Sequence, residues 1–320
     1  MACDEDVSSY FKGTHEVQTC LEGQGEIGLA GYQNQCNKSH KGFVPVNNLT
    51  VQHFPPGYQD KELYDFTKAV ADLTVRIVLK YTSPDRPEFV PGTKDPYPFY
   101  NTRGQNSLRT GTGRVYNVIK YEEGMDENLG PYRTCPCPEC VTSATPRNVW
   151  WRVDVVTARH VVFDESEARQ TRCRLWFDYN KCPVVNLCGW GLGGTESDGD
   201  WCSVYCWSHD SNLCDKLQLL LELFSFQWFG VSHKYKRQRQ VGRLAIVVSH
   251  PHGCCKQVSV GRWIHRQVVV NDWTRYTYTT STCPGSSGAM VYRLGFVSNH
   301  PHSGAGFRGL NYSGVCGDLD

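Results

Sequence analysis

The chain has 320 residues, of which 20% are charged, and its formal net charge is +1. This length and composition indicate a globular protein with a sizeable core, and the near-zero charge gives no electrostatic reason to expect a nucleic-acid or membrane partner. The chain contains no run of 18 apolar residues, and residues 1–13 are acidic and lack an apolar core. We therefore expect neither a transmembrane helix nor a secretory signal.

The first hundred residues predict an extension, a helix, a strand and a loop. Residues 1–62 are polar, and we interpret them as an irregular N-terminal extension that packs on the main body. Apolar residues at helical spacing predict a short helix over 61–72, and a β-branched, nearly alternating pattern predicts a strand over 73–82. Five prolines make residues 83–108 a loop.

From residue 111 onward the chain reads as short strands separated by turns. Their number and spacing favour an antiparallel barrel or sandwich over βαβ units. One segment, 213–224, is apolar and strongly helix-forming, and the basic stretch 233–240 after it predicts a solvated loop. The predicted strands cover residues 111–119, 149–158, 172–179, 200–207, 243–249, 256–263, 267–273, 277–282 and 289–298.

Sixteen cysteines are many for a chain without a secretory signal. They favour a reducing, intracellular and cytoplasmic location with buried or metal-binding thiols. The closely spaced Cys135, Cys137 and Cys140 suit part of a zinc site whose fourth ligand comes from elsewhere, and the alternative is an ordered loop with free or paired thiols. A structural zinc is therefore a candidate cofactor, and no cofactor is required for the chemistry below.

The stretch TCPGSSGAMVY, residues 282–292, has two interpretations. It can be a turn before a strand, since Pro and Gly punctuate loops. It can also be a nucleophile loop, because Ser287 between Gly285 and Gly288 can expose its hydroxyl while backbone N–H groups point at one spot. The second interpretation needs a base and an orienting carboxylate elsewhere in the chain.

His160 and Asp210 are the candidates for those two roles. His160 follows the predicted strand 149–158, and a neutral imidazole can accept a proton from a serine hydroxyl. Asp210 can fix the tautomer of that imidazole, or it can cap the helix that follows it. Asp178, Asp198 and Asp200 are rivals, but their Gly- or Asn-rich turns suggest solvated side chains.

Three motifs in the order His, Asp, Ser resemble those of the chymotrypsin-like, trypsin-type serine peptidases. They are the segments 157–160 (TARH), 210–213 (DSNL) and 285–289 (GSSGA), with separations of 50 and 77 residues between the three candidate side chains. The resemblance covers residues 63–320, and residues 247–261 look like the second-barrel stretch of intracellular, HtrA-like members. It implies a mainly all-β fold of two antiparallel six-stranded barrels with a few helices, the first over about 73–212 and the second over about 225–320.

The resemblance implies a serine endopeptidase that acts on a protein or peptide substrate through an acyl-enzyme. Ser287 would be the nucleophile, His160 the base and Asp210 its orienting partner, and the N–H groups of Gly285 and Ser287 would form the oxyanion hole. Two alternatives remain: a catalytically silent relative that serves as a binding module, and an unrelated all-β interaction protein. The intact residue set argues against the first, and the order of three motifs argues against the second.

The resemblance also bears on specificity and activation. It places Ser281 at the base of the primary pocket, with His302, Ser303 and Gly304 on the facing strand. Because Ser281 is uncharged and Gly304 is small, we expect a roomy, uncharged pocket for Phe, Tyr, Leu or Met. Ser286 stands where secreted members have the aspartate that binds a new N-terminus, so we expect competence without N-terminal cleavage.

Overall fold

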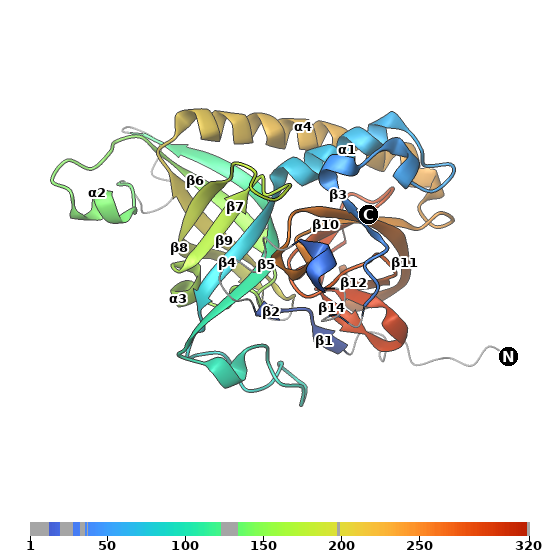
Figure 1. Ribbon diagram of the computed structural model, residues 1–320, viewed down its shortest axis with the longest axis horizontal. Helices are drawn as coiled ribbons and strands as arrows, with labels where there is room; N and C mark the ends of the chain where they lie inside the picture. Colours follow the sequence, from blue (N-terminus) through green and yellow to red (C-terminus); the bar gives the residue numbers. More distant parts are fainter. Residues whose placement is uncertain are drawn as a thin grey trace.

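A computed structural model describes residues 13–19, 28–32, 36, 38–122, 134–196 and 199–318. Two antiparallel sheets lie side by side, and helices α1 and α4 run across one end of both (Figure 1). No helix in these ranges is both long and apolar enough to cross a membrane. The helices are α1 (Lys61–Leu73), α2 (Pro138–Thr142), α3 (Glu165–Ala168) and α4 (Ser211–Tyr235).

The first sheet closes into a six-stranded barrel. Its strands are ordered β5-β4-β7-β8-β9-β6, and β6 pairs back with β5. Every pairing in this ring is antiparallel, so the predicted first barrel is confirmed. The strands are β4 (Thr74–Tyr81), β5 (Asn106–Tyr121), β6 (Trp150–Thr157), β7 (Thr171–Leu175), β8 (Val185–Glu196) and β9 (Trp201–Ser208).

The second sheet forms a similar ring, as the sequence predicted. Its strands are ordered β12-β15-β14-β13-β10-β11, and β11 pairs with β12 to close it. The strands are β10 (Leu244–Ser249), β11 (Gln257–Val270), β12 (Trp273–Tyr278), β13 (Met290–Arg293), β14 (Asn299–Gly306) and β15 (Asn311–Ser313), and β16 (Cys316–Gly317) lies beside β12.

The strand pattern of the sequence differs from the structure in several places. Strand β8 was not predicted, because its glycines give it little intrinsic strand preference. The predicted strands 256–263 and 267–273 form the single strand β11, which bends at register shifts. The predicted strand 289–298 ends at Arg293, where Gly295 adopts φ +82° and turns the chain into β14.

The N-terminal extension contributes strands to both sheets. Strand β1 (Gly13–His15) pairs with β14, and β3 (Phe43–Pro45) pairs with β11 in the second ring. Strand β2 (Gln18–Thr19) pairs with β5 in the first ring. Residues 13–19 therefore cross from one barrel to the other on the side opposite α1 and α4 (Figure 1).

A buried ion cluster connects the proline-rich loop 83–108 to the first barrel. The guanidinium of Arg86 donates to both oxygens of Glu167 at 2.7 Å, and Arg109 lies 2.6 Å from the same carboxylate. Burial alone would raise the pKa of Glu167, but the hydrogen bonds and charge of Arg86, with the charge of Arg109, lower it. Arg86 also donates to the backbone oxygen of His160 at 3.1 Å, so the cluster fixes that residue.

We expect Glu167→Gln to lower the free energy of unfolding by about 3–5 kcal/mol, because it leaves two buried guanidiniums without a counter-charge. Denaturant titration measures the change. Asp65→Asn is the control, since Asp65 forms an exposed helical pair with Lys61 whose loss costs about 0.5 kcal/mol or less. Equal effects of the two substitutions would contradict a structural role for the cluster.

Candidate active site

His160 and Asp200 meet at one end of the first barrel. Strand β6 ends three residues before His160, β9 begins just after Asp200, and the two strands pair through Thr157 and Cys202. The Nδ1 atom of His160 lies 2.8 Å and 3.0 Å from the two carboxylate oxygens of Asp200. Although burial would raise the pKa of Asp200, the charge and hydrogen bond of His160 hold it well below its usual range.

Asp210, the predicted partner of His160, has another place. Its Oδ1 accepts a hydrogen bond at 3.0 Å from the backbone N–H of Leu213, which caps the N-terminus of α4. The structure therefore places Asp200, and not the predicted Asp210, against His160. Asp178 instead pairs with Lys256 at 2.6 Å, and Asp198 lies outside the described residues.

The proposed nucleophile loop connects β12 to β13. Gly285 and Gly288 adopt φ values of +96° and +87°, which favour glycine. A Cβ atom on Gly285 would lie 2.7 Å from the backbone oxygen of His250, so no side chain fits there. The turn consequently directs the N–H of Gly285 and the hydroxyl of Ser287 toward the same point.

The N-terminal extension occupies that point. Ser287 Oγ donates to the carbonyl oxygen of Glu16 at 2.7 Å, and the N–H of Gly285 donates to the same oxygen at 3.2 Å. The N–H of Glu16 donates to the carbonyl of Ser303 at 3.3 Å. The hydroxyl of Ser287 is thus turned toward Glu16 and not toward His160, whose Nε2 has no hydrogen-bond partner among the described residues. The ring of His15 lies 4.5 Å from that of His160.

The side chain of Glu16 enters a polar pocket. His302 Nε2 lies 2.7 Å from one carboxylate oxygen, and Lys38 Nζ contacts the other. Tyr278 Oη lies 2.5 Å from Nδ1 of His302 and fixes the ring. Burial would raise the pKa of Glu16, but His302 and Lys38 lower it to about 2.

The pocket differs from the one that the sequence predicted. It is lined by basic groups and holds a carboxylate, whereas the sequence predicted an uncharged primary pocket. Ser303 and Gly304 lie beside the N-terminal strand, as expected of the facing strand, and contact it through their backbones. Ser281 packs against Gly42 and is not among the hydrogen-bond partners of Glu16. Lys38 was missed because its segment gave no recognisable motif.

Cys135, Cys137 and Cys140 converge with His209 beside α2. The three sulfur atoms lie 3.0, 3.9 and 3.7 Å from Nε2 of His209. Backbone N–H groups point at each sulfur, at 3.3–3.5 Å. His209 is the fourth potential ligand that the sequence could not name.

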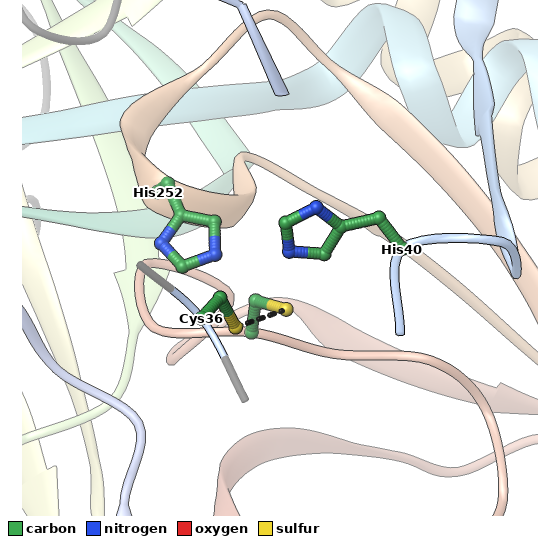
Figure 2. Close-up of side chains that lie close together, drawn as sticks. Cys36, His40 and His252 are labelled. Atoms are coloured by element: carbon green, nitrogen blue, oxygen red, sulfur yellow. Dashed lines mark hydrogen bonds between the residues drawn. The ribbon is translucent and has the colours of Figure 1, made fainter. Parts of the chain in front are cut away.

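A second group of potential ligands lies beside the nucleophile loop. Figure 2 shows Cys36, His40 and His252 facing one another, and Cys283 completes the group with its sulfur 3.7 Å from that of Cys36. All four potential ligand atoms lie within 4.8 Å of one another. Sequence analysis missed this group because its members come from three distant segments, and only the spacing of Cys36 and His40 was a local signal.

Comparison with known proteins leaves the family open. No protein-family model and no curated protein matches the chain. Two solved structures of the Rv3671c protease resemble it at 12% identity: the inactive form, with a TM-score of 0.37, and the active form from M. tuberculosis, with 0.38. Each alignment covers 79% of this chain, and 88% and 80% of the two proteases respectively. Likeness this weak carries no argument about activity.

Proposed function

We propose that the protein is a serine endopeptidase with Ser287 as nucleophile, His160 as general base and Asp200 as its orienting carboxylate. The observation that carries the proposal is the pair of hydrogen bonds from Ser287 Oγ and the Gly285 N–H to one peptide carbonyl. These contacts place a peptide carbonyl beside both the serine hydroxyl and an oxyanion donor. In acyl transfer the N–H keeps its hydrogen bond to the carbonyl oxygen, while Oγ turns from that oxygen to attack the carbonyl carbon.

The chemistry requires the Ser287 hydroxyl to turn from the carbonyl of Glu16 to Nε2 of His160. His160 Nε2 takes the proton of Ser287 as Oγ attacks the carbonyl carbon, and the Gly285 N–H stabilises the oxyanion. The protonated imidazole then delivers its proton to the leaving amine, which leaves an ester on Ser287 that water hydrolyses. Asp200 holds Nδ1, so that Nε2 is the nitrogen available for proton transfer.

A fluorophosphonate probe tests this proposal against the silent binding module. Ser287 is fully buried while Glu16 lies above it, so the probe is best applied to the Glu16→Ala variant as well as to the unaltered chain. We expect labelling of Ser287 in both, faster in Glu16→Ala, and none in Ser287→Ala. Absence of labelling in folded Glu16→Ala would favour the silent module.

The two aspartates provide a matched pair of substitutions. We expect Asp200→Asn to lower kcat by about 10⁴, because the amide no longer fixes the required tautomer of His160. Asp210→Asn should leave kcat and stability nearly unchanged, since Asn caps a helix about as well as Asp. Peptide hydrolysis measures both rates, and a large loss in Asp210→Asn alone would reverse the assignment.

We also infer a structural zinc ion at Cys135, Cys137, Cys140 and His209. Tetrahedral zinc with Zn–S bonds of about 2.3 Å and Zn–N bonds of about 2.0 Å separates its ligand atoms by roughly 3.5–3.8 Å. The distances from His209 to Cys140 and Cys137, 3.7 and 3.9 Å, are close to this spacing, and Cys135 lies nearer, at 3.0 Å. The N–H groups at each sulfur favour thiolates. Helix α2 has only five residues, so a metal would stabilise a segment too short to hold itself.

Metal analysis of purified protein tests the site. We expect Cys137→Ser to lose about one equivalent of zinc relative to the unaltered chain and to melt at a lower temperature, because the remaining ligands no longer close the tetrahedron. Cys182→Ser is the control, since its thiol lies outside both ligand groups and donates to a backbone oxygen. Equal zinc content in the two variants would contradict the site.

A further inference from the structure

Residues 13–19 lie across the proposed active site as a peptide substrate would. On one side of the Glu16–Val17 bond, β1 pairs antiparallel with β14, with Thr14 opposite Ala305 and His15 opposite Gly304. On the other side, Gln18 pairs with Thr110 of β5. Extended backbone pairing on both sides places the carbonyl between them directly at Ser287.

The contacts of Glu16 explain which side chain the pocket selects. His302 cannot use Nδ1 as a donor to the substrate, because that atom is bound to Tyr278, and its Nε2–H is aimed at the carboxylate. The Nε2–H of a neutral imidazole would donate equally to an amide oxygen or to a carboxylate oxygen. Lys38 adds the positive charge that favours the carboxylate, and the carbonyl of Thr282 at 3.3 Å helps to hold its ammonium.

The pocket is also unsuitable for an apolar side chain. Tyr278 and His302 are fully buried, and Glu16 is 4% exposed. A Phe or Leu in this place would leave the buried Nε2–H of His302 without an acceptor and would remove the counter-charge of Lys38, and both changes cost free energy. Both the attraction of the carboxylate and the penalty for apolar residues therefore favour glutamate.

We propose, on the basis of the peptidase function above, that the enzyme cleaves after glutamate and that its own Glu16–Val17 bond is a substrate. Attack by Ser287 forms an ester with the carbonyl of Glu16 and breaks its bond to the nitrogen of Val17, which leaves as an amine with the proton from His160. Water then hydrolyses the ester, giving a carboxylate at Glu16 and restoring the Ser287 hydroxyl. Lys38 lies after the cut and stays with the enzyme.

Intact-mass analysis and N-terminal sequencing of the purified chain test the cleavage. We expect a new N-terminus at Val17 in the unaltered chain, formed at a rate independent of protein concentration, and an uncut chain in Ser287→Ala. Glu16→Gln should slow the cut about tenfold or more, whereas Glu88→Gln, at an exposed glutamate, should not.

A peptide library separates specificity from self-cleavage. We expect hydrolysis after Glu to exceed that after Gln by about tenfold or more in kcat/KM, and Lys38→Met to bring this ratio toward one. Preferred cutting after Phe, Leu or Lys, or an uncut chain whose Ser287 reacts with fluorophosphonate, would overturn the inference and leave the peptidase function standing. Failure of Glu16→Ala to react with the probe would instead defeat the peptidase function.

A different observation, the ligand group in Figure 2, carries a second inference. The sulfurs of Cys36 and Cys283 are 3.7 Å apart, which matches the roughly 3.8 Å between thiolates on tetrahedral zinc. The Nε2 atoms of His40 and His252 are buried and have no hydrogen-bond partner among the described residues. A pair of orphaned imidazole nitrogens beside two thiols is the ligand set of a Cys₂His₂ zinc site.

Surrounding contacts support that assignment. Gln18 Oε1 lies 2.8 Å from Nδ1 of His252, which leaves Nε2 as its ligand atom, and the N–H of Lys38 donates to the sulfur of Cys36 at 3.4 Å. We infer that a zinc ion at Cys36, His40, His252 and Cys283 ties the N-terminal extension to the nucleophile loop. Because Cys36 and His40 flank Lys38, the ion would also hold the charged wall of the pocket.

Zinc content and the non-reduced intact mass test this second site. We expect His40→Ala and Cys283→Ser each to lose about one equivalent of zinc while the zinc at Cys135, Cys137, Cys140 and His209 is retained. The double variant His40→Ala/Cys137→Ser should lose about two equivalents. His53→Ala, at an exposed histidine, should lose none. His40 is partly exposed, so circular dichroism can establish that its variant is folded. Full zinc retention in His40→Ala, or a Cys36–Cys283 disulfide in the non-reduced mass, would overturn the inference.

Discussion

Thr112 of β5 joins the two barrels at the point on which the candidate active site depends. It is fully buried, its N–H donates to the carbonyl of Ser287 and its hydroxyl donates to that of Gly285, each at 2.8 Å. On the other side, the hydroxyl of Thr157 donates to the carbonyl of Thr112 at 2.7 Å. His160 follows Thr157 by three residues, so this chain of hydrogen bonds fixes the nucleophile loop of one barrel against the histidine of the other.

A buried carboxylate needs compensating partners, and this need explains the place of the N-terminal extension. Glu16 loses its hydration in the pocket, and the basic groups of His302 and Lys38 replace it. Backbone pairing of β1 and β2 adds hydrogen bonds on both sides of the carboxylate. The extension is therefore held by the same groups that would bind a glutamate-containing peptide under the specificity proposed above.

Both candidate metal sites lie where the chain has little apolar core of its own. Helix α2 is a single short turn inside the insertion between β5 and β6, and its three cysteines pack against Trp150 and Trp190. Residues 38–42, which include His40, have no regular secondary structure before β3. Metal ligation stabilises such segments by cross-linking them to ordered parts of the barrels, as His209, next to β9, and His252, in the turn after β10, would do here.

Local patterns in the sequence determined much of this protein. Alternating apolar residues predicted most strands of both barrels, glycines marked the turn at Ser287, and His160 was found at the end of its strand, because each of these features depends on near neighbours. Tertiary structure decided the rest. Asp200 rather than Asp210 reaches His160 because the pairing of β6 with β9 brings their ends together, and the local cap motif at Asp210 had two valid interpretations. The pocket residues Lys38 and His302, and the group of four potential ligands that includes Cys283, come from segments up to hundreds of residues apart. No spacing within the sequence indicates these contacts, because only the closure of the two barrels and the crossing of the N-terminal extension create them.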